Sequence, residues 1–214
     1  MNGLIRYTML GHTMLGLSNA QPGDLMHRLT RRAFAMAATL TLLGIAVPPV
    51  HAQATAAPTT VILVRHAEKA STPSADPPLT PAGEARARAL LAAVHDAGVD
   101  AIITTQFLRT RSTAAPTATA LGITPEVVSA TGATHVQDVA AAIRKHAGHT
   151  VLVVGHSNTV PGIIAALGAP QPPPICDEQY DNLYIVTIPP NGPARVIEAR
   201  YGEPSIASGC GTMK

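Results

Sequence analysis

Two histidines in this sequence each follow a short, uninterrupted run of apolar residues. Arg65 and His66 follow the first run, and Gly155 and His156 follow the second. Runs of this length are typical of strands buried on both faces of a parallel sheet. Ligands of such sheets bind just past the carboxyl ends of the strands. We therefore expect both histidines at one edge of a sheet, with a guanidinium beside the first that favours an anionic ligand.

Phosphate is the anion that these residue types fit best. Arg65 and Arg109, which follows a second predicted strand, can match phosphate oxygens bidentately and stay charged. The start of the helix expected after His156 would add backbone N–H donors. A neutral imidazole held there can attack phosphorus and form a covalent intermediate. A metal site would need a third ligand, for which only Glu68 is placed, and arginines would repel the cation. We therefore predict no metal and no organic cofactor.

The elements that position these residues alternate between strand and helix along the chain. Thr80 is expected to cap a helix whose first residue is Pro81. A Pro- and Gly-rich loop separates the last two strands and predicts a hairpin. This order predicts an α/β, three-layer αβα domain, with a mostly parallel sheet, helices on both faces and a C-terminal antiparallel hairpin. The expected strands are 60–64, 99–104, 126–128, 150–154, 183–188 and 195–201, and the expected helices are 81–97, a segment ending near 121, 136–147 and 158–167.

The composition excludes several classes of protein. The chain has 214 residues, of which 46% are hydrophobic, so it can bury a full core and is not disordered. Aromatic residues make up only 3%, Trp is absent and the net charge is +2. Nucleic-acid binding normally needs stacking aromatics or a strongly basic face, so we predict no nucleic-acid partner.

The N-terminal region has the three parts of a secretory signal peptide. Residues 26–32 are basic, residues 33–47 are apolar, and Ala52 stands at a site that a signal peptidase reads. We therefore expect an extension and signal peptide over 1–52 with Met26 as the true start, a flexible lead-in over 53–59 and one domain over 60–214. The product would be exported, periplasmic or secreted, with no stable membrane insertion after cleavage. A retained anchor is the alternative.

Two further features of the exported chain stay open. Arg31 and Arg32 resemble a twin-arginine signal, but paired arginines are common in ordinary signals, so the general secretory and twin-arginine routes remain alternatives. Cys176 and Cys210 are the two cysteines, and an even count in an exported protein predicts a disulfide. Two unpaired thiols are the alternative.

Three motifs in order resemble the histidine phosphatase superfamily, which includes phosphoglycerate mutases and phosphohistidine phosphatases. Its Arg-His-Gly motif is matched by Arg65 and His66, with Ala67 in place of the glycine. Its Gly-His motif is matched by Gly155 and His156. Its second motif is matched by Thr105, Arg109, Thr113 and Ala114, whereas Ser112 departs from the usual glutamine. The small single-domain build resembles that of the phosphohistidine phosphatases.

The resemblance implies a role for each motif residue. His66 would be the phosphorylated nucleophile, Arg65 and Arg109 the phosphate ligands, and His156 the stabiliser of the transferred group. Ser157 and Glu68 stand beside the histidines and are further candidates for substrate binding. The general acid stays open among four candidates, which are Glu126, His135, Asp138 and Asp181.

The sequence thus predicts an exported, cofactor-independent phosphatase that acts on phosphomonoesters or phosphoramidates through a phosphohistidine intermediate. Its partner would be a phosphorylated small molecule, an envelope glycan or a phosphoprotein, because a chain of this size leaves little room for a cap over the site. The alternative function is a phosphoryl-binding module of the same fold without turnover.

Overall fold

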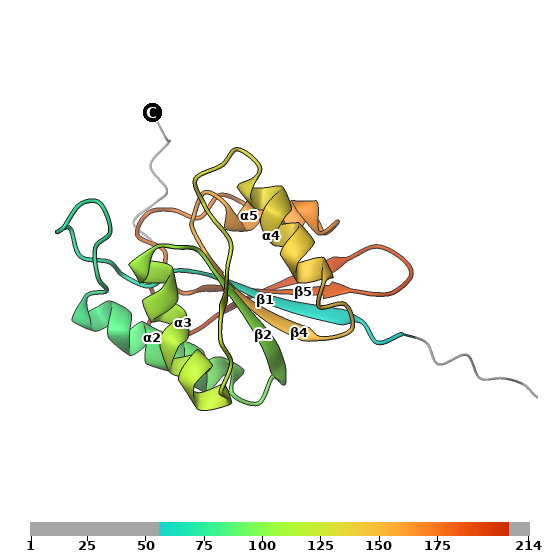
Figure 1. Ribbon diagram of the computed structural model, residues 1–214, viewed down its shortest axis with the longest axis horizontal. Helices are drawn as coiled ribbons and strands as arrows, with labels where there is room; N and C mark the ends of the chain where they lie inside the picture. The colour runs from blue at the N-terminus through green and yellow to red at the C-terminus, as the bar shows by residue number, and fades with distance from the viewer. Residues whose placement is uncertain (1–55, 206–214) are drawn as a thin grey trace, which may run out of the picture. The chain divides into compact units, whose positions relative to one another are not determined.

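The computed structural model describes residues 56–205, which form a six-stranded sheet with helices on both faces (Figure 1). The strand order is β3-β2-β4-β1-β5-β6. The strands are β1 (Thr59–Arg65), β2 (Val99–Thr104), β3 (Glu126–Val127), β4 (Thr150–Gly155), β5 (Asn182–Ile188) and β6 (Arg195–Arg200). The helices are α2 (Pro81–Val94), α3 (Leu108–Leu121), α4 (His135–Arg144) and α5 (Val160–Ala166).

The four strands from β1 to β4 run parallel, and β5 and β6 complete the sheet as an antiparallel hairpin. The β1 residues Val61, Leu63 and Val64 are fully buried, as expected for a strand covered on both faces. β1 and β4 are neighbours whose last residues, Arg65 and Gly155, pair directly. The predicted fold class is therefore confirmed, and this register brings the two histidine motifs side by side.

Two layers of helices cover the sheet on opposite faces (Figure 1). Leu90 and Val94 of α2 and Ala114 of α3 pack on one face with Ile102 of β2. The other face is covered by α4 and α5, whose buried side chains are Val139, Ala140, Ile143, Ile163 and Ile164. Apart from Tyr184 and Tyr201, both cores consist of aliphatic side chains, which accounts for the high Ala, Val, Leu and Ile content.

Local signals place the helix ends. The Thr80 hydroxyl accepts a hydrogen bond from the Gly83 N–H at 3.1 Å, which confirms the predicted cap of α2. α2 ends at Val94, three residues earlier than predicted, because residues 95–97 form a turn. α3 ends at Leu121, and the cap residue Gly122 has a left-handed φ of 66° that glycine adopts without steric cost.

The N-terminus of α3 is capped from a distant loop. The side chain of its N-cap residue, Phe107, has no atom that can accept a hydrogen bond. Instead, the Asp76 carboxylate accepts from the Leu108 N–H at 2.8 and 3.0 Å. Pro116 lies inside the helix. The sequence therefore left this boundary uncertain, since the cap lies 32 residues away.

Some predictions concern residues that the structure does not describe. The signal peptide over 1–52, the lead-in up to residue 55 and Cys210 all lie outside residues 56–205. Export, cleavage and the Cys176–Cys210 disulfide therefore stay predictions. Within the described range, no helix has both the length and the apolar character needed to cross a bilayer.

Candidate active site

His66 and His156 lie side by side at the carboxyl end of the parallel strands. The His66 N–H donates to the Gly155 carbonyl at 2.9 Å and so extends the pairing of β1 with β4 by one residue. The two imidazole rings are 5.4 Å apart between centroids, at an interplanar angle of 65°. Both residues are buried, with 4% and 8% of their surface exposed. The structure thus brings together the two histidines that the sequence placed at one sheet edge.

The His66 ring is held in one tautomer. Its Nδ1 lies 2.8 Å from the Ala67 carbonyl oxygen, which can only accept a hydrogen bond. Nδ1 must therefore carry the proton, and the neutral ring keeps a lone pair on Nε2. A lone pair on a fixed imidazole is what a nucleophile for phosphorus requires.

The loop that carries His66 is fastened to α3 through one buried hydroxyl. The Ala67 N–H donates to the Thr113 hydroxyl at 2.9 Å, and this hydroxyl donates to the Arg109 carbonyl at 2.7 Å. Thr113 and Ala67 have no exposed surface. Thr113, which matched the second motif by sequence, therefore ties the first motif to the helix that carries Arg109.

His156 is oriented by a pair of threonine hydroxyls. Its Nε2 lies 3.2 Å from the Thr105 hydroxyl, which lies 2.9 Å from the Thr110 hydroxyl. Thr110 can donate to the Phe107 carbonyl at 2.8 Å. This chain of hydroxyls can accept the Nε2 proton or donate to Nε2, so it holds the ring in place in either protonation state.

Arg65 is buried against the segment before β5. Its Nη1 donates to the carbonyls of Cys176, Asp177 and Gln179 at 2.7, 2.8 and 3.0 Å. Its guanidinium carbon lies 4.1 Å from the centre of the Tyr180 ring. The Nε of Arg65 is buried and has no hydrogen-bond partner in the described protein.

Arg109 has a similar environment on the side of α3. Its guanidinium carbon lies 4.1 Å from the centre of the Phe107 ring, and its Nη1 lies 3.8 Å from an Asp76 oxygen. The Nε of Arg109 is also buried without a partner among the described residues. Buried donors normally have acceptors. Two guanidiniums with unused donors beside two histidines therefore suit an anion with several acceptor oxygens.

The electrostatics keep both imidazoles neutral. Burial is the largest cause that lowers the pKa of His66, to about 3, and the positive charges of Arg65 and Arg109 lower it further. Burial and Arg109 also lower the pKa of His156, to about 4. Burial lowers the pKa of both arginines, which stay charged at neutral pH. The two arginines therefore supply positive charge beside an uncharged nucleophile.

Glu68 and Ser157, which were also predicted to bind substrate, have different surroundings from the arginines. The Glu68 carboxylate accepts from the Arg86 Nε at 2.9 and 3.0 Å and lies 2.8 Å from its Nη2. Ser157 follows His156 directly and is partly exposed. Contact of Glu68 or Ser157 with substrate stays a prediction, and the structure gives Glu68 a partner within the protein.

The four candidates for the general acid have separate locations. Glu126 lies 3.5 Å from Lys145 and 3.7 Å from His146 on the surface. Asp138 is exposed and accepts from the Thr134 hydroxyl. Asp181 is buried and lies 2.9 Å from Arg200. These three carboxylates all have partners away from the histidine pair.

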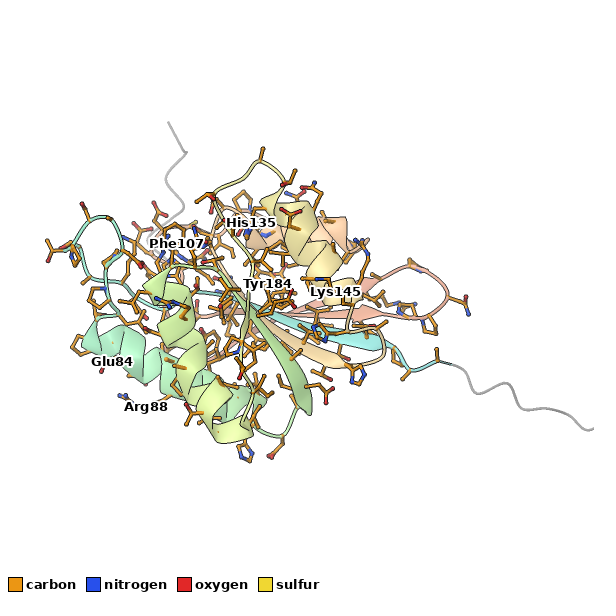
Figure 2. All side chains as sticks on the ribbon, in the orientation of Figure 1. Glu84, Arg88, Phe107, His135, Lys145 and Tyr184 are labelled. Carbon is orange, nitrogen blue, oxygen red and sulfur yellow. The ribbon has the colours of Figure 1, made fainter. Side chains whose placement is uncertain are left out.

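His135 is the remaining candidate. It begins α4 and is labelled in Figure 2, together with Phe107 at the start of α3. It is 4% exposed, its Nδ1 donates to the Ser129 carbonyl at 2.9 Å, and its buried Nε2 has no partner within residues 56–205. His135 is among the groups that lower the pKa of His156, so it lies within electrostatic reach of that ring. Its part in proton transfer stays a prediction.

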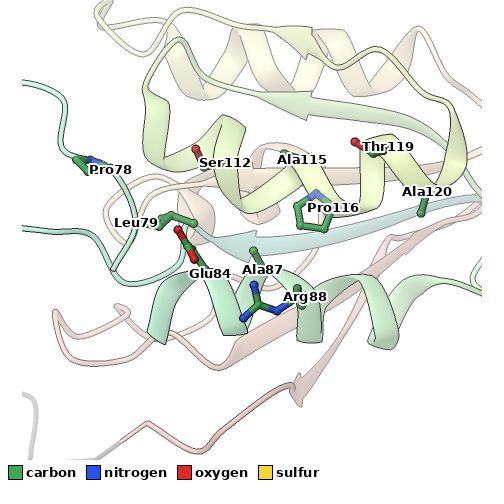
Figure 3. Close-up of a pocket in the computed structure, with 10 residues that line it drawn as sticks. All are labelled: Pro78, Leu79, Glu84, Ala87, Arg88, Ser112, Ala115, Pro116, Thr119 and Ala120. Atoms are coloured by element: carbon green, nitrogen blue, oxygen red, sulfur yellow. The ribbon is translucent and has the colours of Figure 1, made fainter. Parts of the chain in front are cut away.

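Other features of the described domain lie apart from this chemistry. A groove of about 550 Å³ runs between α2 and α3 and is lined by Glu84, Arg88, Ser112 and mostly small apolar side chains (Figure 3). Neither histidine nor either arginine of the site contributes to it. In residues 56–205, no three His, Cys, Asp or Glu side chains gather as a set of metal ligands.

Several residues of the site were missed by sequence reasoning. Phe107 precedes Arg109 by two positions, and its rarity as an aromatic in this chain was a usable signal. Tyr180 and Asp76 gave no such signal, because they reach the arginines from loops far away in the sequence. Thr110 is an ordinary helix residue by sequence and becomes informative only through its hydrogen bond to Thr105.

The sequence matches a known family over the first two motifs. The family model of the histidine phosphatase superfamily (branch 1) matches residues 61–131, which contain His66 and both arginines. The third motif, with His156, lies beyond the matched range. No curated protein sequence matches the chain.

Several solved structures have the same fold, and the match with this domain extends over nearly the whole length of each. A protein assigned as the phosphohistidine phosphatase SixA from Nakamurella multipartitia is 24% identical, with a TM-score of 0.50 over 70% of this chain and 98% of that one. The protein histidine phosphatase SixA in complex with tungstate is 18% identical, with a TM-score of 0.51 over 66% and 96%. A protein assigned as an alpha-ribazole-5'-P phosphatase from Escherichia coli K-12 is 14% identical, with a TM-score of 0.51 over 69% and 98%.

The shared fold and the family match confirm the predicted resemblance. Residues 61–131 resemble the histidine phosphatase superfamily (branch 1), and this match supports phosphatase activity. The motifs of the family coincide with the histidines and arginines that the structure brings together.

Proposed function

We propose that this protein is a cofactor-independent phosphatase that hydrolyses phosphomonoesters or phosphoramidates through a phosphohistidine on His66. One observation carries the proposal. The free Nε2 lone pair of His66 lies beside His156, and two arginines with buried, unpartnered Nε groups flank the pair. The arrangement supplies a nucleophile and donors for phosphoryl oxygens in one place.

The reaction would proceed in two displacements. The His66 Nε2 attacks phosphorus, the bond from phosphorus to the leaving oxygen or nitrogen breaks, and the leaving group departs with the electron pair and gains a proton. Water then attacks the phosphohistidine, which releases inorganic phosphate and restores the lone pair of His66. The guanidiniums of Arg65 and Arg109 would stabilise the charge on the equatorial oxygens in both steps.

His156 would contribute a further donor to the transferring group. The centroid of its ring lies 5.4 Å from that of the His66 ring, which supports contact with the same phosphoryl group. The Thr105 hydroxyl keeps the ring oriented whichever nitrogen carries the proton. Three of the candidate general acids are carboxylates that are bound to other residues, which favours a substrate whose leaving group departs without a strong acid. The neighbours named as phosphohistidine phosphatases support a substrate of this kind.

Export is part of the proposal. The basic segment 26–32, the apolar segment 33–47 and Ala52 support cleavage of a signal peptide and a periplasmic or secreted location. N-terminal sequencing of the protein isolated from its native host would test it. A mature chain beginning near Gln53 is expected, whereas a retained residue 26–52 segment would contradict export by cleavage.

The test of the activity is hydrolysis of a chromogenic aryl phosphate in metal-free buffer, combined with trapping of the phosphoenzyme. We expect turnover that a chelator does not abolish, and an acid-labile, alkali-stable phosphoryl group on His66. Tight phosphate binding without turnover would instead favour the phosphoryl-binding module. Turnover that is lost with chelator would contradict the cofactor-independent mechanism.

A further inference from the structure

Each phosphate-facing arginine of the site has one aromatic ring and one carboxylate beside it. Tyr180 stacks on Arg65, with its ring 6.3 Å from the His66 ring, and Asp177 lies 3.9 Å from the Arg65 Nη2. This arrangement recurs around the second arginine. Phe107 stacks on Arg109, with its ring 5.7 Å from the His156 ring, and Asp76 lies 3.8 Å from the Arg109 Nη1.

The two rings differ from the other aromatic side chains in residues 56–205. Tyr184 and Tyr201 are core residues, with 2% and 5% of their surface exposed. Phe107 and Tyr180 are only partly buried, although they lie against the buried histidines. Partly exposed aromatic side chains beside a reacting centre can contact a second ring through an offset or edge-to-face arrangement.

The carboxylates make the surroundings of the site acidic. The Asp177 side chain is 92% exposed and the Asp76 side chain, which also caps α3, is 40% exposed, so neither negative charge is enclosed by the protein. Glu178 is also exposed and is among the carboxylates that act to raise the pKa of Arg65, which places it near that guanidinium. The arginines offset the charge of one phosphoryl group, but any further anionic group on the substrate would meet these carboxylates.

We propose, on the basis of the proposed phosphatase function, that Phe107, Tyr180, Asp76 and Asp177 determine the substrate class. The site selects a phosphoryl group carried on a planar aromatic ring, through oxygen or nitrogen, that bears no further negative charge. Phosphorylated carboxylic acids and bisphosphates are disfavoured by the acidic surroundings. Non-planar alkyl phosphates lack the ring contact.

The test compares phenyl phosphate with 2,2,2-trifluoroethyl phosphate on wild-type protein and on Phe107→Leu and Tyr180→Leu variants. We expect kcat/KM for phenyl phosphate to fall by about 3- to 10-fold relative to the alkyl substrate in each variant, which is the size of an aromatic pair contact. An equal fall for both substrates would show that the rings only support the arginines and would overturn the proposal. Each variant is compared with the wild-type protein on the same substrate, so the difference in leaving-group acidity between the two substrates cancels.

The charge component is tested with 4-carboxyphenyl phosphate against phenyl phosphate. Asp177→Asn should raise the relative kcat/KM for the carboxylated substrate by about 2- to 5-fold, as for removal of one exposed charge pair. Asp96→Asn is the matched control, because the Asp96 side chain is 97% exposed and pairs with the neighbouring His95. An unchanged ratio in Asp177→Asn would overturn the charge selection.

The outcomes separate this inference from the function on which it rests. No turnover of any of these substrates by the wild-type protein would overturn the phosphatase function and the substrate class together. Turnover with a ratio that no variant changes would overturn only the substrate class. Circular dichroism of each variant establishes that a changed ratio comes from folded protein.

Discussion

Glu68, two residues after His66, forms a bidentate ion pair with Arg86 of α2. The Arg86 side chain is 5% exposed, and the Glu68 carboxylate meets its Nε and Nη2 at distances of 2.8 to 3.0 Å. The Arg86 Nη1 also donates to the Tyr201 carbonyl at 3.1 Å. The pair therefore joins the first motif, α2 and the segment after β6, and it fixes the loop from which the nucleophile projects.

Replacement of Glu68 by Ala should destabilise the domain. The change leaves the buried Arg86 guanidinium without its counter-charge, and breaking such a pair costs about 3 kcal/mol. Chemical denaturation of the variant would measure the loss. Glu203→Ala is the control, since Glu203 is exposed, and the double variant Glu68→Leu/Arg86→Met should recover part of the loss. If Glu68 contacts substrate instead, Glu68→Ala would lower kcat/KM with little change in unfolding free energy.

Replacement of His66 by Ala should abolish turnover while the fold survives. The variant keeps both arginines and His156, so it should still bind phosphate although it lacks the attacking lone pair. Steady-state hydrolysis and phosphate binding by calorimetry would measure the two properties separately. His95→Ala is the matched control, because the His95 side chain is 61% exposed at the end of α2. Normal turnover by His66→Ala would exclude this residue as the nucleophile.

Replacement of Arg109 by Ala should reduce kcat more than it weakens substrate binding. Loss of one donor to the developing charge costs about 2.7–4 kcal/mol of transition-state stabilisation, or about 10²- to 10³-fold in kcat. Arg111→Ala in the same helix is the control, since Arg111 is exposed and leaves the site unchanged. A rise in KM at constant kcat would mean that Arg109 binds the ground state and the transition state equally.

The sequence was sufficient to predict the histidine pair and its sheet edge. The apolar runs before His66 and His156 have no polar break, so they indicated buried parallel strands, and parallel strands end on the same edge. The structure makes these strands direct neighbours. Adjacency did not follow from the pattern alone, because strand order depends on how the helices between the strands cross the sheet.

The surroundings of the arginines could not be predicted in the same way. Tyr180 lies 115 positions from Arg65 in the chain, and Asp76 caps a helix that begins 32 positions later. These contacts come from loops that tertiary packing places, and neither loop has a periodic pattern. Gly83 is a further example, because any side chain there would collide with the Glu68 carbonyl, and the sequence shows only a glycine early in a helix.

The predicted disulfide can be tested without reference to activity. Titration of thiols under denaturing, non-reducing conditions should find no free thiol, because we expect Cys176 to pair with Cys210. In the chain-entropy model such a bridge contributes about 3–4 kcal/mol, so reduction should lower the unfolding free energy by that amount. It would also loosen the segment whose carbonyls Arg65 holds. Two titratable thiols would contradict the pairing.

The depressed histidine pKa values also predict how stability depends on pH. In the unfolded chain His66 has an ordinary pKa of 6.5, whereas burial and the nearby arginines lower it to about 3 in the folded domain. Between these values the unfolded state binds a proton that the folded state does not. The contribution of His66 to unfolding free energy is therefore constant above pH 6.5 and declines as the pH falls toward 3. His156, whose pKa is lowered to about 4, acts in the same direction.

His66→Asn removes this dependence, so the variant should gain stability relative to the wild-type domain as the solution becomes more acidic. One pH unit corresponds to about 1.4 kcal/mol for one group, which gives a relative gain of about 2 kcal/mol between pH 7 and pH 5. Urea unfolding of both proteins across that range would measure it, with His95→Asn as the exposed control. A constant difference between His66→Asn and wild type would mean that His66 titrates alike in both states. Burial beside two guanidiniums would then not lower the pKa of His66, and it would not explain a neutral imidazole at the site.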